Sequence, residues 1–300
     1  MTRSGFVSLL GRPNAGKSTL LNRLVGAHLA IVSDKPQTTR TRILGARSLP
    51  GGQLLFLDTP GVHRPMHRMN VRMVDAAIAA ARDADVVALV VDASEAVGGG
   101  TEYLLGLLPP LAQPVVLVLN KIDRVKKHDL LPLIDWFSSR HQFADVVPVS
   151  AATGENVERL EQVLLSHLPE GPPLYPDDYL TDQSARSLAA EMVREQVLAH
   201  TRAELPFTTA VVVDRYEEPG EDDDALLAIY CSILVEAPSQ KAIVIGRRGE
   251  MIKAIGTAAR RQIEAFFERR VYLDLHVKVR EDWRENDRAL DELGLPKRKR

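Results

Sequence analysis

Residues 11–18, which read Gly-Arg-Pro-Asn-Ala-Gly-Lys-Ser, constrain the fold of this chain more than any other segment. They match the pattern G-x-x-x-x-G-K-S, follow an apolar run and open a helical pattern. In such a loop, glycines let backbone N–H groups turn toward phosphate, at a helix N-terminus whose dipole favours anions. Lys17 is expected to contact the β- and γ-phosphates of a nucleotide, and Ser18 to offer its hydroxyl to Mg²⁺. The pattern therefore predicts an α/β fold that binds a nucleotide.

Short apolar runs alternate with longer helical patterns over the first 168 residues, which is typical of a parallel sheet covered by helices on both faces. The predicted strands are residues 6–10, 54–57, 86–91, 115–119 and 146–149, with a weaker strand at 42–49. The predicted helices are residues 18–25, 69–82, 101–108, 129–138 and 157–168. We predict a P-loop domain with a mixed, mostly parallel sheet.

Residues 169–176 contain four prolines and a glycine, so they fit neither a helix nor a central strand. We predict a first domain at 1–170, a linker at 171–182 and a second domain at 183–300. The second domain reads as α+β. Its predicted elements are helices at 182–203 and 250–269, strands at 208–213, 227–235 and 271–279, and a short apolar approach at 242–245.

Residues 120–123, Asn-Lys-Ile-Asp, follow a predicted strand at the sheet edge where open α/β folds bind ligands. Guanine presents a pair of N–H donors that one carboxylate can accept, and adenine does not. Asp123 is therefore predicted to select guanine, while Asn120 and Lys121 brace the base. Ser150 and Ala151 follow the next strand and are expected to close the pocket, with the Ala151 N–H directed at the guanine carbonyl.

Residues 58–61, Asp-Thr-Pro-Gly, follow another predicted strand. Asp58 is expected to hold the water shell of Mg²⁺, and the Gly61 N–H to sense the γ-phosphate. A threonine between the loop and Asp58 is expected to add its hydroxyl to Mg²⁺ when GTP is bound. We predict Thr39 for this role, with Thr38 as the alternative.

The candidate residues therefore fall into three overlapping sets. The nucleotide-binding set is Gly11, Asn14, Ala15, Gly16, Lys17, Ser18, Thr19, Asp58, Asn120, Lys121, Asp123, Ser150 and Ala151. The metal set is Ser18, Thr39 and Asp58, and the catalytic set is Lys17, Thr39 and Gly61. Over residues 5–168 the ordered motifs resemble those of translation-factor-type GTPases, which implies GTP hydrolysis.

Val62 stands where Ras-like GTPases carry a glutamine that orients the attacking water. A valine cannot hold water by a hydrogen bond, so we expect slow intrinsic turnover. In GTPases that this chain resembles, an asparagine at the position of Asn14 is associated with K⁺ near the β- and γ-phosphates. We hypothesise that K⁺ supplies charge there.

Residues 246–249, Gly-Arg-Arg-Gly, lie between an apolar run and a long amphipathic helix. Local charge supports a nucleic-acid site, because Lys and Arg outnumber Asp and Glu from residue 241 onward although the whole chain has a formal net charge of -2. The segment looks like the G-x-x-G loop of a KH domain, which clamps single-stranded RNA. The candidate RNA-binding residues are Ile245, Gly246, Arg247, Arg248, Gly249 and Lys253.

These motifs together resemble the Era family of bacterial ribosome-associated GTPases, as do the stretches at 171–179, 205–207 and 277–290. The resemblance implies a G domain followed by a type II KH domain, GTP or GDP with Mg²⁺, and binding near the 3′ end of 16S rRNA during maturation of the small (30S) ribosomal subunit. It also implies a cytoplasmic monomer with peripheral contact at the inner membrane face. An acidic insertion at 217–224 departs from the family pattern, and we interpret it as a loop between strands.

Two alternatives differ in class. In one, the chain is an RNA-binding protein whose nucleotide is a structural ligand. In the other, it is a GTPase in tRNA modification, which would call for further catalytic groups such as a reactive cysteine. The chain has one cysteine, Cys231, so no intramolecular disulfide can form and a reducing cytoplasm fits. No apolar run is long enough to span a membrane.

Overall fold

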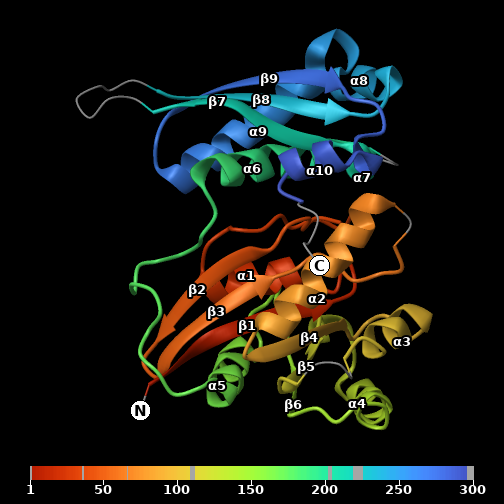
Figure 1. The fold of residues 1–300 in the computed structure, drawn as a ribbon, viewed down its shortest axis with the longest axis vertical. Coiled ribbons are helices and arrows are strands. Elements are labelled where there is room, and N and C mark those ends of the chain that lie inside the picture. Colours follow the sequence, from red (N-terminus) through yellow and green to blue (C-terminus); the bar gives the residue numbers. More distant parts are fainter. Residues whose placement is uncertain are drawn as a thin grey trace. The chain divides into compact units, whose positions relative to one another are not determined.

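The structure, a computed structural model, describes residues 2–35, 37–65, 67–108, 112–201, 205–218 and 226–295 (Figure 1). Within these ranges the chain divides into two compact units. The first comprises Met1–Ala30 and Thr39–Asp182, and the second comprises Ile31–Thr38 and Gln183–Lys297. Part of the acidic insertion and the basic tail, residues 219–225 and 296–300, lie outside the described residues.

The first unit is built on a sheet in the order β2-β3-β1-β4-β5-β6. Its strands are β1 (Arg3–Gly11), β2 (Ile43–Leu49), β3 (Gly52–Asp58), β4 (Val86–Asp92), β5 (Val115–Asn120) and β6 (Asp145–Pro148). Only β2 runs antiparallel to its neighbour within this sheet. The predicted mixed, mostly parallel sheet is confirmed, and so is the weaker strand at 42–49.

Helices cover this sheet and direct its loops. They are α1 (Lys17–Val25), α2 (Arg68–Asp83), α3 (Gly99–Leu105), α4 (Leu130–Ser138) and α5 (Val157–His167), with short 3₁₀ turns η1 (Ile122–Arg124) and η2 (Lys127–Asp129). Residues of α2, α3 and α4 share one apolar cluster with β4 and β5, while α1 and α5 contact β1 and β3. The parallel strands β1, β3, β4 and β5 end at one edge, where the predicted site residues gather.

The second unit packs helices on one side of a three-stranded sheet in the order β7-β8-β9, in which β7 is antiparallel and β9 parallel to β8. Its elements are α6 (Ala185–His200), α7 (Leu205–Thr208), β7 (Ala210–Glu217), β8 (Leu227–Val235), α8 (Pro238–Ile245), η3 (Arg247–Gly249), α9 (Glu250–Phe267), β9 (Val271–Val279), η4 (Trp283–Glu285) and α10 (Asp287–Glu292). The predicted α+β class is confirmed. Residues 242–245 form the last turn of α8, and α7 is an additional helix.

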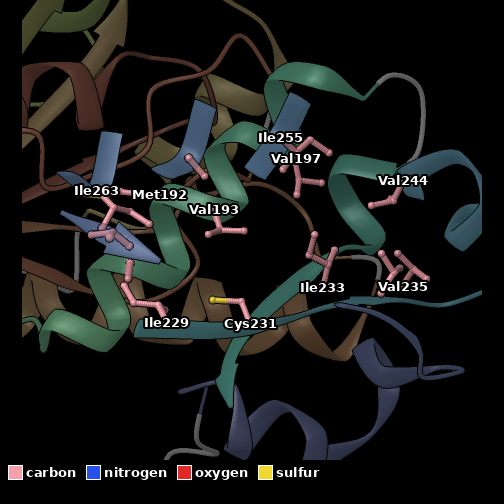
Figure 2. Close-up of a cluster of buried hydrophobic side chains, with 14 of the residues drawn as sticks. Met192, Val193, Val197, Ile229, Cys231, Ile233, Val235, Val244, Ile255 and Ile263 are labelled. Atoms are coloured by element: carbon pink, nitrogen blue, oxygen red, sulfur yellow. The ribbon is translucent and has the colours of Figure 1, made fainter. Parts of the chain in front are cut away.

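The core of the second unit lies between α6, α9 and the inner face of the sheet (Figure 2). Alternate β8 residues, Ile229, Cys231 and Ile233, point inward and are fully buried. Met192 and Val193 of α6 meet them from the helical layer (Figure 2). This packing fixes α9 against the sheet and so positions the G-x-x-G loop at its start.

The proline-rich segment is tied to the first unit. The Gln53 side chain accepts hydrogen bonds from the backbone of Leu174 (2.9 Å) and Tyr175 (3.0 Å), and donates to the Tyr175 carbonyl (2.9 Å). Tyr175 and Tyr179 stack with ring centroids 4.3 Å apart.

No helix in the described ranges combines the length and apolarity needed to cross a bilayer.

Candidate nucleotide site and nucleic-acid groove

The phosphate loop joins β1 to α1 and depends on two glycines. Gly16 has φ +90°, and a Cβ there would lie 2.3 Å from Asn120 Nδ2. A Cβ on Gly11 would lie 2.3 Å from the Val90 carbonyl oxygen. The Lys17 ammonium donates to the carbonyls of Gly11 (3.2 Å) and Arg12 (3.0 Å). The loop backbone is thus packed too closely for side chains at these positions, as a phosphate cradle requires.

Three oxygen-bearing side chains from different elements converge beside Lys17. The Ser18 and Thr39 hydroxyl oxygens are 2.8 Å apart, and each lies 2.9 Å from Asp58 Oδ2. The other carboxylate oxygen, Asp58 Oδ1, is buried without a hydrogen-bond partner among the described residues. Such hard oxygen donors suit Mg²⁺, which binds one or two protein ligands together with phosphate and water. The geometry favours Thr39 over Thr38.

Burial sets the protonation of this pair of opposite charges. Desolvation lowers the pKa of Lys17 from 10.5 to about 8, although the neighbouring Asp58 charge acts in the opposite direction. Desolvation also raises the pKa of Asp58, opposed by Lys17 and by hydrogen bonds from Ser18 and Thr39. The described residues contain no group of three or more His, Cys, Asp and Glu that could hold a metal. The Ser18 and Thr39 hydroxyls, with the nucleotide phosphates, would supply oxygen ligands to Mg²⁺.

The lowered pKa predicts that nucleotide binding takes up a proton in alkaline solution. Above about pH 8 the empty protein carries a neutral Lys17, whereas bound phosphate favours the ammonium form. GTP affinity should therefore fall with rising pH, by up to about tenfold per pH unit. Calorimetry in two buffers of different ionisation enthalpy, at pH values on either side of the pKa, measures the uptake. Uptake that persists in Lys17→Met would contradict this assignment.

The predicted base pocket is held together by Asn120 at the end of β5. Its amide donates to the Ala15 carbonyl (2.9 Å) and accepts from the Ala151 N–H (3.0 Å). Ser150 donates to Asp123 Oδ1 at 2.6 Å, which orients the carboxylate. The structure thus brings the three predicted loops together. Because the Ala151 N–H is engaged by Asn120, its contact with a guanine carbonyl stays a prediction.

Asp92 was not among the sequence candidates, yet it positions Lys121. The two side chains lie 2.5 Å apart, and Lys121 has φ +64°. Burial raises the pKa of Asp92, but hydrogen bonds from Lys121 and Ser94 outweigh it and the net pKa is lowered. Its place at the end of β4, beside Asn120 in register, is the signal that could have indicated it.

Val62 and Gly61 both lie next to the phosphate loop, but their surroundings differ. Val62 is fully buried and belongs to the apolar cluster of the first unit, while its N–H donates to the Gly11 carbonyl (3.0 Å). A Cβ on Gly61 would lie 2.6 Å from the Pro13 nitrogen, so this backbone approaches the phosphate loop closely. Asn14 is exposed with φ +62°. The proposed K⁺ contact of Asn14 stays a prediction.

The G-x-x-G segment forms a tight turn between α8 and α9. Gly246 and Gly249 have φ +73° and +80°, and Arg248 has φ +52°. Arg247 and Arg248 are exposed at the turn, and Ile245 ends α8. The turn therefore presents backbone and two cations at the N-terminus of an 18-residue helix.

A groove of about 450 Å³ runs along α9 and β9 beside this turn. Ile252 and Leu273 contribute apolar surface, and Tyr272 an aromatic ring. Lys253 and Arg260 on α9 are exposed and add positive charge. Apolar and aromatic walls with a basic rim suit unstacked bases attached to a phosphate backbone. Lys253, predicted from the motif, is thus joined by residues that the motif alone does not indicate.

Comparison with known proteins agrees with both halves of this description. The family described as 50S ribosome-binding GTPase matches residues 6–121, and the family described as KH domain matches residues 209–284. The chain is 49% identical over 291 residues to GTPase Era of Geotalea daltonii, covering 97% of both chains. The chain belongs to the Era family of GTPases. It is also 47% identical to GTPase Era of Geobacter metallireducens, again over 97% of both chains.

Two solved Era structures share this fold over nearly the whole chain. A point variant of Aquifex aeolicus Era bound to GDP.AlF4- has a TM-score of 0.93 at 39% identity, covering 98% of this chain and 100% of that chain. Era in complex with MgGDPNP and nucleotides 1506-1542 of 16S ribosomal RNA has a TM-score of 0.94 at 39% identity, covering 99% of this chain and 100% of that chain. The Era family architecture, a G domain followed by a type II KH domain, is therefore confirmed.

Proposed function

We propose that this Era-family GTPase binds 16S rRNA near its 3′ end and acts as a GTP-controlled factor in maturation of the small ribosomal subunit. The observation that supports the proposal is the presence of two candidate sites in one chain. One is the Ser18–Thr39–Asp58 oxygen cluster beside the phosphate loop. The other is the groove along α9 and β9, whose lining includes Lys253 and Arg260, together with the G-x-x-G turn that precedes α9. Era with both ligands bound supports the pairing.

Within this proposal six of the predicted residues have a stated chemical task. Lys17 would neutralise charge on the β- and γ-phosphates, Ser18 and Thr39 would hold Mg²⁺ through their hydroxyls, and Asp58 would hold its water. Gly61 gives its N–H to the γ-phosphate and Asp123 recognises guanine. Hydrolysis removes the γ-phosphate and with it the ligand that orders the Thr39 and Gly61 loops.

Cys231 argues against the alternative in tRNA modification. Its thiol is fully buried, and burial raises its pKa to about 12, with Asp214 and Asp274 adding to the shift. The reactive thiolate is therefore essentially absent at neutral pH. No nucleophilic cysteine is available, because this is the single cysteine of the chain.

The remaining parts of the proposal concern the localisation of the protein in the cell and its oligomeric state. A factor that acts on the small subunit works in the cytoplasm, and one chain holds both sites, so a monomer suffices. Peripheral contact with the inner membrane face is carried over from the family resemblance.

Binding of a short single-stranded RNA that copies the 3′ end of 16S rRNA tests the proposal, with a non-hydrolysable GTP analogue, GDP or no nucleotide present. A Cβ on Gly249 would meet nothing within 4 Å, and Gly249→Asp and its neutral match Gly249→Asn share the same backbone strain at φ +80°. Repulsion between carboxylate and phosphate should weaken Gly249→Asp by about tenfold relative to Gly249→Asn.

Three outcomes are informative. Tight binding that depends on the GTP analogue, with the charge effect at residue 249, supports a nucleotide-gated rRNA factor. Binding that is indifferent to nucleotide favours the alternative in which the nucleotide is a structural ligand. Absence of RNA binding would favour the alternative in which the GTPase acts on a different substrate.

A further inference from the structure

The segment between the phosphate loop and Thr39 belongs to the second unit, and its residues Val32, Lys35 and Thr38 contact α6. The Lys35 ammonium donates to the carbonyls of Leu198 and Thr201 at the C-terminal end of α6. A cation there is stabilised by the helix dipole and by carbonyls that lack partners inside the helix. One turn earlier, Glu195 Oε1 accepts a hydrogen bond of 2.9 Å from the Val32 N–H.

Arg194 holds the other end of this segment. Its guanidinium donates to the Thr38 carbonyl through Nη2. The same group is oriented by a two-pronged contact with Glu191, in which Nε and Nη2 lie 2.9 and 2.5 Å from the carboxylate oxygens. Arg194 is only 1% exposed. The contact with Glu191 therefore holds the orientation in which the guanidinium donates to the Thr38 carbonyl.

The backbone next to this contact is held in an uncommon conformation. Gln37 has φ +64°, which costs a non-glycine residue free energy and persists where neighbouring contacts enforce it. Thr38 follows, with its carbonyl on Arg194, and its peptide bond leads into Thr39. The Thr39 hydroxyl is the group found beside Ser18 and Asp58.

We propose that Arg194 is a positioning residue for GTP hydrolysis, supplied by the second unit. By holding the Thr38 carbonyl, it fixes the peptide that places the Thr39 hydroxyl at the magnesium site. This inference rests on the proposed role of Thr39 in magnesium binding. It assigns a task in hydrolysis to a residue of the second unit, which also contains residues 209–284 that match a KH domain.

A purely structural role explains Arg194 less well. The Arg194 side chain is buried although its partner Glu191 is 33% exposed, and burying a charge is a weak source of stability, because apolar residues of similar volume pack in its place at similar or lower cost. Here the third guanidinium nitrogen, Nη1, is also buried without a hydrogen-bond partner among the described residues. The arrangement leaves one donor unsatisfied while Nη2 reaches the Thr38 carbonyl.

The test compares Arg194→Met, Arg194→Lys and Lys35→Met in the full chain. Arg194→Met should lower kcat for GTP about tenfold or more, the effect of one charge-assisted hydrogen bond. Affinity for a non-hydrolysable GTP analogue should fall by a similar factor relative to affinity for GDP. The affinities of Arg194→Met for GDP and for RNA should stay unchanged. Arg194→Lys should recover part of the lost kcat. Lys35→Met should lower kcat and the GTP-to-GDP preference by a few-fold.

Arg186→Met is the matched control, because Arg186 is an exposed arginine of α6 whose guanidinium lies 5.8 Å from the Tyr216 ring centroid. Unchanged kcat and an unchanged GTP-to-GDP preference in Arg194→Met would overturn the inference. If Arg194→Met loses both GDP binding and RNA binding, the variant has lost its fold and Lys35→Met becomes the deciding variant. An unchanged kcat and GTP-to-GDP preference in Lys35→Met would then overturn the inference.

Thr39→Ala separates this inference from the proposed function. If Thr39→Ala lowers the GTP-to-GDP preference and Arg194→Met does not, only the positioning role fails. If Thr39→Ala has no effect, the magnesium role assigned to Thr39 fails first.

Discussion

Asp123→Asn is expected to weaken GTP binding about a thousandfold and to create a preference for xanthosine triphosphate. The Asp123 carboxylate is proposed to accept two N–H groups of guanine, and each charge-assisted hydrogen bond contributes about 1.5–3 kcal/mol. Ser150 donates to Asp123 Oδ1, so in the variant it would hold the amide oxygen and leave the amide N–H facing the base. Xanthine has a carbonyl where guanine has an amino group, and therefore accepts from that N–H.

Equilibrium binding and single-turnover hydrolysis with both nucleotides measure the exchange. Asp129→Asn is the control, since this exposed carboxylate lies in the same region next to His128. It should leave both affinities unchanged. Equal weakening of GTP and xanthosine triphosphate in Asp123→Asn would argue that Asp123 supports the loop rather than reading the base.

Gly246→Ala should reduce RNA affinity about a hundredfold while hydrolysis measured without RNA stays as it is. Gly246 has φ +73° and ψ 175°, a region that is essentially restricted to glycine and costs other residues about 1–3 kcal/mol. An added Cβ would also lie 2.5 Å from Met251 Cβ and 2.8 Å from the Met251 nitrogen. The turn must therefore open, and the first turn of α9 moves with it.

Gly249→Ala provides the comparison within the same turn. Gly249 has φ +80°, but a Cβ there would meet nothing within 4 Å. The alanine at 249 should cost only a few-fold in RNA affinity, since strain acts there without collision. Thermal unfolding followed by circular dichroism shows whether the domain remains folded. Equal RNA affinities for the two alanine variants would contradict the role given to the Gly246 contact.

Much of the fold and site could be predicted because the signals are local in the chain. The apolar runs that became β1, β4 and β5 are continuous because helices bury both sides of the sheet. The phosphate loop places its lysine and serine at fixed offsets from its glycines, and residues 120–123 follow a strand at a fixed edge. These motifs specify backbone geometry over a few residues, which a single sequence carries in full.

The remaining features depend on contacts between residues far apart in sequence. In the structure the Thr39 hydroxyl contacts Asp58, whereas the Thr38 carbonyl accepts from Arg194, and nothing in the local sequence distinguishes the two threonines. In the sequence, Arg194 is one of several charged residues in a predicted helix, and nothing distinguishes it from the others. Asp92 likewise acquires its role only when β4 and β5 lie side by side.

The burial of Cys231 makes the unmodified chain a suitable background for site-specific labelling. Maleimide dyes react with exposed thiolates, and the one native thiol is buried with its pKa raised to about 12. A cysteine introduced at an exposed position, such as Ser139 in the first unit or Ala265 in the second, would therefore be the only reactive thiol. A dye pair at both positions would report the distance between the two units by energy transfer as GDP is exchanged for a GTP analogue.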